Sequence, residues 1–161
     1  MVLIDSLYVM INLREITKEN LISIIDLDVS EHQRDQVASN AVSIAQGHYS
    51  KSAWFKGIFN DDVAVGFVMV DIIIEENKCF LWRFMIDEKY QGKGYGKIAL
   101  NQVINYIQSF KVFDEIKTSY VPTENSAEGF YKNFGFTESE EIIKEFDLED
   151  SGEIGMKYSL L

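Results

Sequence analysis

A run of three glycines, each two residues after the last and flanked by lysines, is the segment of this chain best suited to bind an anion. The run reads QGKGYGK, and its residues are Gln91, Gly92, Lys93, Gly94, Tyr95, Gly96 and Lys97. Glycine lets the backbone approach a ligand closely, and the start of a following helix attracts negative charge. The two lysines add positive charge to a chain whose formal net charge is −11. The run therefore predicts a phosphate-binding turn.

Two familiar nucleotide-binding motifs do not fit this run. A P-loop needs a Lys followed by Ser or Thr after its glycines, and the run has no such pair. A dinucleotide fingerprint tolerates Ala99 in the place of its third glycine, but it belongs on the first strand of a Rossmann fold. Here the run follows four predicted strands. Taken alone, it is as consistent with a plain helix start as with a phosphate site.

The elements that must position the turn follow a mixed α/β pattern. Alternating or β-branched residues predict strands at Ile11–Ile16, Ser52–Phe59, Ala64–Ile74, Cys79–Ile86, Glu115–Tyr120, Phe136–Leu148 and Glu153–Leu160. Capping residues predict helices at Thr17–Leu27, Ser30–Gly47 and Asn125–Asn133. Gln33 completes a capping box for the second of these, and Gly135 is the C′ residue of the third. Helical spacing predicts a further helix after the glycines, with an apolar stripe formed by Leu100, Val103, Ile104 and Ile107. The predicted order is β-α-α-β-β-β-α-β-α-β-β, with parallel strands in the middle of a mixed sheet.

Length and composition set the class of protein. The 161 residues, 47% of them apolar and 25% charged, suit one domain at residues 11–161, after an extension at residues 1–10 that lacks the features of a secretion signal. No apolar run is long enough to cross a bilayer, and the acidic balance weighs against nucleic acid. The single Cys79 indicates a reducing compartment, so we expect a cytoplasmic protein. No Cys/His cluster has the spacing of a zinc site, so no metal is expected.

A second motif follows the next predicted strand. Residues 125–136 read NSAEGFYKNFGF. Together with the glycine run and the element order, this segment resembles the GCN5-related N-acetyltransferase (GNAT) superfamily over nearly the whole chain from Ile11. The segments VSEHQ at 29–33, SIAQ at 43–46, WRFMI at 82–86 and TSY at 118–120 resemble bacterial spermine/spermidine (diamine) N-acetyltransferases more narrowly.

The resemblance implies acetyl-coenzyme A as cofactor and direct acetyl transfer to a primary amine. Backbone N–H groups of residues 91–97 would hold the pyrophosphate. Phe84, Met85 and Ile86 would pair with the pantetheine arm, and one of their N–H groups would polarise the thioester carbonyl. Tyr131 matches the tyrosine that protonates the departing thiolate, and Asn125 matches an asparagine that contacts the cofactor. Both residues also have plain structural explanations, as a packed aromatic ring and as a helix N-cap.

The acceptor side is less defined by the sequence. A polyamine is the favoured acceptor. The carboxylates of Glu31, Glu75 and Glu76 could attract its ammonium groups, and the indoles of Trp54 and Trp82 could stack on its cationic or methylene segments. Each of these residues also fits a solvated or core position. Family members often carry a glutamate on the strand before the glycine run, whereas this chain has Arg83 and no carboxylate there. The proton acceptor is therefore unassigned, with a water relay to Glu31 or Asp71 as one alternative.

Other functions stay open on this evidence. The acceptor could instead be a protein N-terminus, a lysine or an aminoglycoside. A non-catalytic acetyl-CoA-binding module would keep the glycine run without the chemistry, and a plain α/β scaffold would bind no ligand. The resemblance also brings a homodimer into consideration, because dimers are common in the superfamily.

Overall fold

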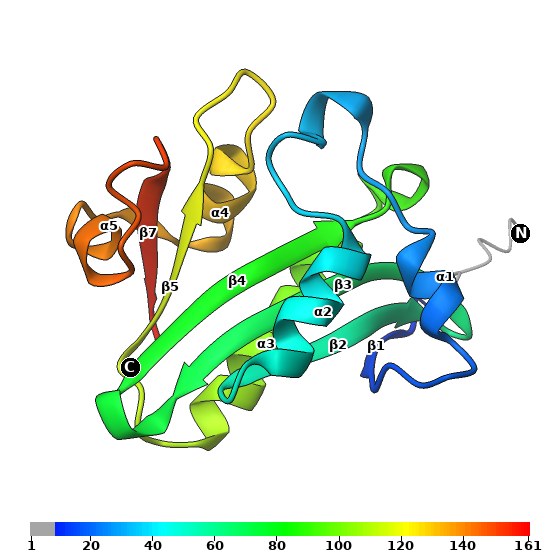
Figure 1. Cartoon of the computed structure of the whole chain (residues 1–161), viewed down its shortest axis with the longest axis horizontal. Helices are drawn as coiled ribbons and strands as arrows, with labels where there is room; N and C mark the ends of the chain where they lie inside the picture. Colours follow the sequence, from blue (N-terminus) through cyan, green and yellow to red (C-terminus); the bar gives the residue numbers. More distant parts are fainter. Residues whose placement is uncertain (1–8) are drawn as a thin grey trace, which may run out of the picture.

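A seven-stranded mixed sheet forms the centre of the molecule in the computed structural model, which describes residues 9–161. The strands run in the order β1-β2-β3-β4-β5-β7-β6 (Figure 1). Their bounds are β1 Ile11–Arg14, β2 Ala53–Asn60, β3 Val63–Ile73, β4 Lys78–Ile86, β5 Glu115–Tyr120, β6 Thr137–Glu138 and β7 Ile154–Ser159. The helices are α1 Leu21–Ile25, α2 Asn40–Tyr49, α3 Tyr95–Ser109, α4 Glu128–Phe134 and α5 Glu141–Glu145, with 3-10 turns η1 Glu31–Gln33, η2 Ile74–Glu76 and η3 Glu88–Tyr90. The predicted mixed α/β class with a parallel central pair is confirmed.

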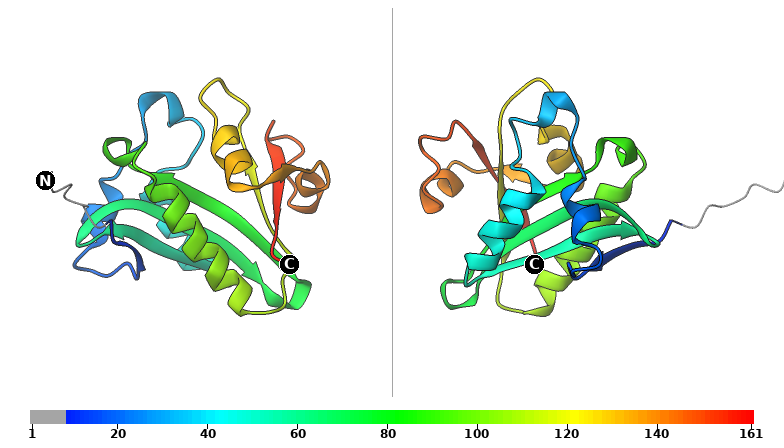
Figure 2. Two further views of the ribbon diagram at one scale, coloured as in Figure 1. Left: turned by 180° about the vertical axis from the view of Figure 1, so that it is seen from behind. Right: turned by 45° about the vertical axis from the view of Figure 1, so that its right-hand side comes forward.

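Two helical layers cover the two faces of the sheet. Helix α3 crosses one face, as the left view of Figure 2 shows, while α1 and α2 lie on the other. The predicted stripe of α3 is buried, with Leu100, Val103 and Ile107 at 0% exposure. On the other face Ile24 of α1 packs in a second cluster with Phe67 of β3 and Met85 of β4. Side chains of β4 therefore alternate between two separate cores.

The sheet opens between its two central strands. β4 and β5 run parallel but share one registered pair, Phe80 with Lys117. Beyond it, the Thr118 hydroxyl donates to the Leu81 carbonyl at 3.0 Å. On the other side of the opening, β5 is paired with β7 over six residue pairs. The later half of β4 therefore presents a backbone edge that β5 does not pair with.

The second predicted helix begins later than its sequence signal. The capping pattern at Ser30 and Gln33 starts only the short η1, where the Gln33 Oε1 accepts from the Ser30 N–H at 3.3 Å. Helix α2 begins at Asn40, capped by the Ser39 side chain, which accepts from the Val42 N–H at 3.3 Å. The prediction that Gly47 ends this helix is wrong. Helix α2 continues to Tyr49, and Gly47 fits inside it because a Cβ there would lie 2.8 Å from the Phe55 ring.

Three further boundaries differ from the prediction. Thr17 does not cap α1, because its N–H donates to the Asn20 side chain at 2.8 Å within the preceding turn. The predicted strand at 136–148 is broken by α5, whose first turn carries Glu141 and whose buried face carries Ile142. Acidic residues favour a helix N-terminus, which explains the change. Asn125 is not an N-cap, since α4 begins three residues later with Ala127 in that position.

The last residue of the expected extension, Met10, hydrogen-bonds to the end of β2 and the turn after it. The Met10 carbonyl accepts from the Asp61 N–H at 3.0 Å, and the Met10 N–H donates to the Asn60 side chain at 3.2 Å. The rest of the predicted extension, residues 1–8, lies outside the described residues. Within residues 9–161, no helix has the length and apolar character that a bilayer crossing requires.

Candidate active site

The glycine turn is open at the start of α3. Gly92 and Gly94 adopt positive φ angles of 75° and 81°, and a Cβ at either position would meet no atom within 4 Å. Gly94 occupies the N-cap position of α3, and no side chain caps the helix there. Among the described residues, the backbone hydrogen bonds outside helices and strands include no donation from the N–H groups of residues 92–97. These amides are therefore free to bind an anion at the positive end of a 15-residue helix.

Gln91 uses its side chain to hold the turn in place. Its Nε2 donates to the Ile86 carbonyl and to the Gln33 Oε1, both at 2.9 Å. The contact joins the end of β4 to η1, two segments far apart in the sequence. Because the Gln91 side chain already donates to the Ile86 carbonyl, this oxygen is not free to accept a hydrogen bond from a cofactor.

Asp87, just after the end of β4, also holds this region in place through hydrogen bonds. This residue was not identified from the sequence. It is buried at 6% exposure. One carboxylate oxygen accepts from the Asp28 N–H at 2.9 Å and the other from the Lys89 N–H at 3.0 Å. Hydrogen bonds from backbone amides satisfy a buried carboxylate. The position after the strand, before a turn, is the signal that could have identified it.

A β-bulge in β4 changes which side chains face the cavity. Met69 of β3 pairs with Arg83 and Val70 pairs with Leu81, which leaves Trp82 as the extra residue. Trp82 packs against the cluster on the α1/α2 face. The Arg83 Nη2 donates to the Gln46 Oε1 of α2 at 3.3 Å. Two consecutive side chains therefore lie on one face, as bulges allow.

A cavity of about 1100 Å³ runs along the opening between β4 and β5. It begins at the glycine turn, passes the β4 edge at Phe84, Met85 and Ile86, and ends among side chains of distant segments. That end is lined by aromatic, acidic and hydroxyl groups, those of Asp71, Phe80, Trp82, Ser119, Phe146 and Glu153. The Gln36 side chain donates to the Thr123 hydroxyl at 2.6 Å, which links the two loops that follow η1 and β5.

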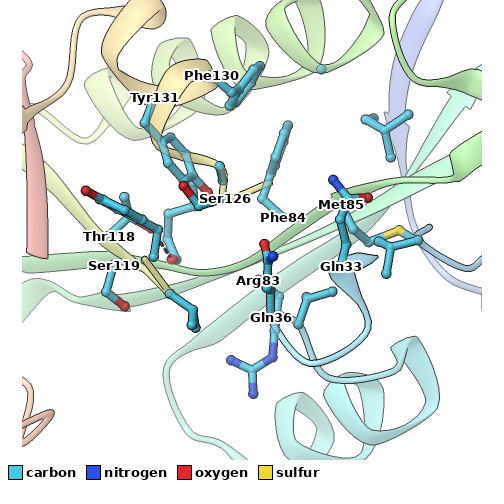
Figure 3. A pocket seen from close by; sticks show the side chains of 18 of the residues that line it. Gln33, Gln36, Arg83, Phe84, Met85, Thr118, Ser119, Ser126, Phe130 and Tyr131 are labelled. Atoms are coloured by element: carbon cyan, nitrogen blue, oxygen red, sulfur yellow. Dashed lines mark hydrogen bonds between the residues drawn. The ribbon is translucent and has the colours of Figure 1, made fainter. Parts of the chain in front are cut away.

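Tyr131 of α4 lines the middle of this cavity. It is 6% exposed and packs against Phe130 and Phe136. Figure 3 shows Tyr131 beside Thr118 and Ser126, on the side of β4 toward which Phe84 points, while Arg83 extends the other way. Burial raises the pKa of Tyr131 to about 12, and hydrogen bonding with Thr118 opposes the rise. The phenol is therefore protonated at neutral pH and can donate a hydrogen bond into the cavity.

The structure does not bring together all of the predicted site residues. Among those expected to bind the cofactor, Lys93 and Asn125 are absent from the cavity lining, and both are exposed. Among those expected to bind the acceptor, only Trp82 lines the cavity. Glu31 is exposed on η1. Trp54 stacks on Tyr106 of α3 at 4.6 Å, on the other face of the sheet.

Glu75 and Glu76 are exposed on η2, which joins β3 to β4 at the end of β4 away from the glycine turn. Glu76 forms an ion pair with Lys78 at 2.8 Å. The carboxylates that do line the far part of the cavity, Asp71 and Glu153, were not predicted as binding residues. No local motif marks them, because the positions of β3 and β7 on either side of β4 and β5 place them there.

Cys79 is not a nucleophile. Its side chain is 1% exposed, and burial raises the pKa of the thiol to about 12, with Asp71 adding to the rise and Lys117 opposing it. A thiol that stays protonated is a poor nucleophile. Cys79 is therefore a buried, unreactive thiol.

Comparison with known proteins identifies the family. The acetyltransferase (GNAT) family model matches residues 10–136. A spermine/spermidine N(1)-acetyltransferase of Bacillus subtilis strain 168 is 33% identical over 135 residues, covering 78% of this chain and 87% of that protein.

Solved structures share the fold at lower identity. The PaiA N-acetyltransferase of Thermoplasma acidophilum, in complex with coenzyme A, is 20% identical with a TM-score of 0.67, covering 93% of this chain and 99% of that one. A chimera of spermidine N-acetyltransferase SpeG from Vibrio cholerae is 18% identical with a TM-score of 0.67, covering 93% and 95%. Since the family match spans most of the chain and the sheet opens beside an uncapped glycine turn, this chain belongs to the acetyltransferase (GNAT) family and is an acetyl-CoA-dependent N-acetyltransferase.

Proposed function

We propose that this enzyme acetylates a primary amino group of a polyamine such as spermidine or spermine. The observation that carries the proposal is the cavity itself, which leads from the glycine turn to a chamber that contains two carboxylates and several aromatic rings. Carboxylates attract ammonium groups, and aromatic faces pack against methylenes and cations. The name of the 33% identical Bacillus protein supports the same acceptor class.

The residues present fit acetyl-CoA as the donor. The open Gly92 and Gly94 would let a pyrophosphate approach the free amides of residues 92–97, and a side chain at either position would require a strained backbone. Lys97 lines the same end of the cavity and would add positive charge. The backbone edge at Phe84 and Met85 is free of β5 and would pair with the pantetheine arm. When bound, acetyl-CoA supplies an activated thioester carbonyl.

Tyr131 supplies a proton donor close to the β4 edge in this proposal. Its phenol keeps its proton at neutral pH because burial raises the pKa to about 12. A backbone N–H of Phe84 or Met85 would donate to the carbonyl oxygen as negative charge develops there. Both groups are fixed by surrounding packing, so neither must reorganise during the reaction. Asn125 would contact the cofactor only from the exposed turn before α4.

An acceptor screen tests the proposal. The purified enzyme would be incubated with acetyl-CoA and with spermidine, spermine, short diamines, peptides carrying a free N-terminus or lysine, and an aminoglycoside. Release of free thiol would be followed in each case. The proposal expects kcat/KM to be at least tenfold higher for a polyamine or diamine than for the peptides and the aminoglycoside. A higher value for a peptide or an aminoglycoside would refute the polyamine assignment, and absence of turnover with stabilisation by acetyl-CoA would indicate a binding module.

Location and assembly belong to the same proposal. A cytoplasmic enzyme would keep the buried Cys79 thiol reduced. A homodimer is the assembly that the superfamily resemblance suggests, and light scattering of the purified chain would measure it.

A further inference from the structure

Two carboxylates that are far apart in the sequence, those of Asp71 and Glu153, share the far part of the cavity. Asp71 lies on β3, and Glu153 directly precedes β7. Both line the cavity and are half-buried. The Asp71 Oδ1 accepts from the Ser52 hydroxyl, and the Glu153 Oε1 accepts from the Ser119 hydroxyl at 3.0 Å. Each carboxylate is thus oriented by a neighbouring hydroxyl.

The two carboxylates lie at different depths along β4. Asp71 pairs with Phe80, near the start of the strand. Ser119, which holds Glu153, lies two residues after Lys117, the partner of Phe80, and is therefore level with Trp82. The cofactor edge begins at Phe84. An extended strand rises about 3.3 Å per residue, so Asp71 is set roughly 13 Å from that edge and Glu153 roughly 7 Å. Glu153 is the nearer carboxylate to the reacting end.

Neither carboxylate is neutralised by an ion pair among residues 9–161. The salt bridges within 4.0 Å in this part of the chain do not include Asp71 or Glu153. Lys117 on the neighbouring strand is paired with Glu145 of α5 at 2.6 Å. Arg83 of β4 is a positively charged residue that lines the same cavity.

Arg83 is an unusual neighbour for a cationic substrate. Its Nη1 donates to the Trp82 carbonyl at 2.9 Å and its Nη2 to Gln46, while its buried Nε has no hydrogen-bond partner. Burial lowers the pKa of Arg83, and the negative charge of Glu153 opposes this change. A fixed positive charge beside the reacting amine disfavours the ammonium form. An amine must lose a proton before it can attack, so this effect assists the reaction.

We propose that Glu153 accepts the proton of the reacting ammonium group and that Asp71 binds a second ammonium group of the same acceptor. This inference rests on the proposed polyamine function and defines its substrate class as amines with two or more amino groups. In the proton step, an N–H bond of the acceptor breaks, an O–H bond forms on Glu153, and the electron pair stays on nitrogen for attack. The separation along β4 matches one acceptor that bridges both carboxylates through a methylene chain.

Two variants with different readouts test the two roles. Glu153→Gln should lower kcat about 100-fold for every acceptor. Asp71→Asn should raise KM about tenfold for spermidine and butane-1,4-diamine, and should change KM for butylamine less than twofold. Glu149→Gln is the matched control, because it removes one carboxylate from an exposed position in the preceding turn.

Specific outcomes would overturn the inference. Glu153→Gln with unchanged kcat would remove the proton-acceptor role. If Asp71→Asn raises KM equally for butylamine and for the diamine, Asp71 does not bind a second ammonium group. If this variant fails to fold, Asp71→Ser is measured in its place. Wild-type enzyme that turns over peptides and no polyamine would instead refute the proposed function, which keeps the two failures distinct.

Discussion

Replacing Tyr131 by Phe tests the proton-donor role at the centre of the cavity. The variant removes one oxygen and keeps the ring, which packs against Phe130 and Phe136. Folding should therefore change little, by about 1 kcal/mol or less, because the ring stays packed and at most one hydrogen bond of the hydroxyl is lost. Any large loss of rate would then come from the missing O–H group.

The raised pKa sets the expected magnitude. Tyr131 has a pKa of about 12. An ordinary thiol has a pKa of about 8.5, so full proton transfer from this phenol to a thiolate would be uphill by about 3.5 pKa units, or about 4.8 kcal/mol. The phenol therefore acts mainly by donating a hydrogen bond as the thiolate departs. We expect kcat to fall about 100-fold, equivalent to about 2.7 kcal/mol of transition-state stabilisation.

Initial rates of thiol release between pH 7 and 10 measure the effect. The wild-type enzyme should show no loss of kcat from Tyr131 ionisation in this range, because the phenol loses its proton only near pH 12. Tyr158→Phe is the matched control, since Tyr158 packs on the core beside Phe134 and does not line the cavity. If Tyr131→Phe retains full kcat at every pH while Tyr158→Phe does so too, the donor role is wrong.

Three further perturbations test other parts of the structure. Gly94→Ala forces a residue with a side chain to adopt a φ of 81°, which costs about 1–2 kcal/mol, so KM for acetyl-CoA should rise about tenfold. Gly152→Ala is the control, because Gly152 has a similar φ of 72° at an exposed turn, and this variant should leave KM for acetyl-CoA unchanged. Thr118→Val removes the 3.0 Å hydrogen bond to the Leu81 carbonyl and should lower the free energy of unfolding in urea by about 1–3 kcal/mol. The Cys79 pKa is raised from 9.0 to about 12, so its neutral form stabilises the fold below pH 9 and this contribution, up to about 4 kcal/mol, is lost as pH rises from 9 to 12. Cys79→Ala should flatten that alkaline loss, and an unchanged slope would contradict the assignment.

The glycine turn and the strand before it could be predicted because their signals are local. Glycine permits the positive φ angles observed at Gly92 and Gly94, and helical spacing predicts the buried stripe of α3. The predicted start of α2 at Ser30 was wrong because two capping signals, at Ser30 and Ser39, compete. Only the second precedes residues that continue as a helix, and side-chain contacts hold the first as a single turn.

The acceptor end of the cavity could not be predicted in the same way. Asp71 and Glu153 are separated by about half of the chain, and no spacing rule connects them. Their meeting depends on the order of strands in the sheet and on the opening between β4 and β5. The β4 bulge adds a second shift, because the regular alternation of a strand would place Trp82 and Arg83 on opposite faces. Glu31, Glu75 and Glu76 were chosen for their charge, and the fold places them at the solvent-exposed surface.

The single registered pair between β4 and β5 has a consequence for the mechanics of the enzyme. One residue pair and one side-chain hydrogen bond join two otherwise well-bonded half-sheets. An acyl donor that hydrogen-bonds to the free edge of β4 occupies the place of a pairing strand and strengthens the connection between the two half-sheets. The melting temperature of the protein should then rise with the concentration of its acyl donor, so resistance to unfolding would report the supply of that metabolite.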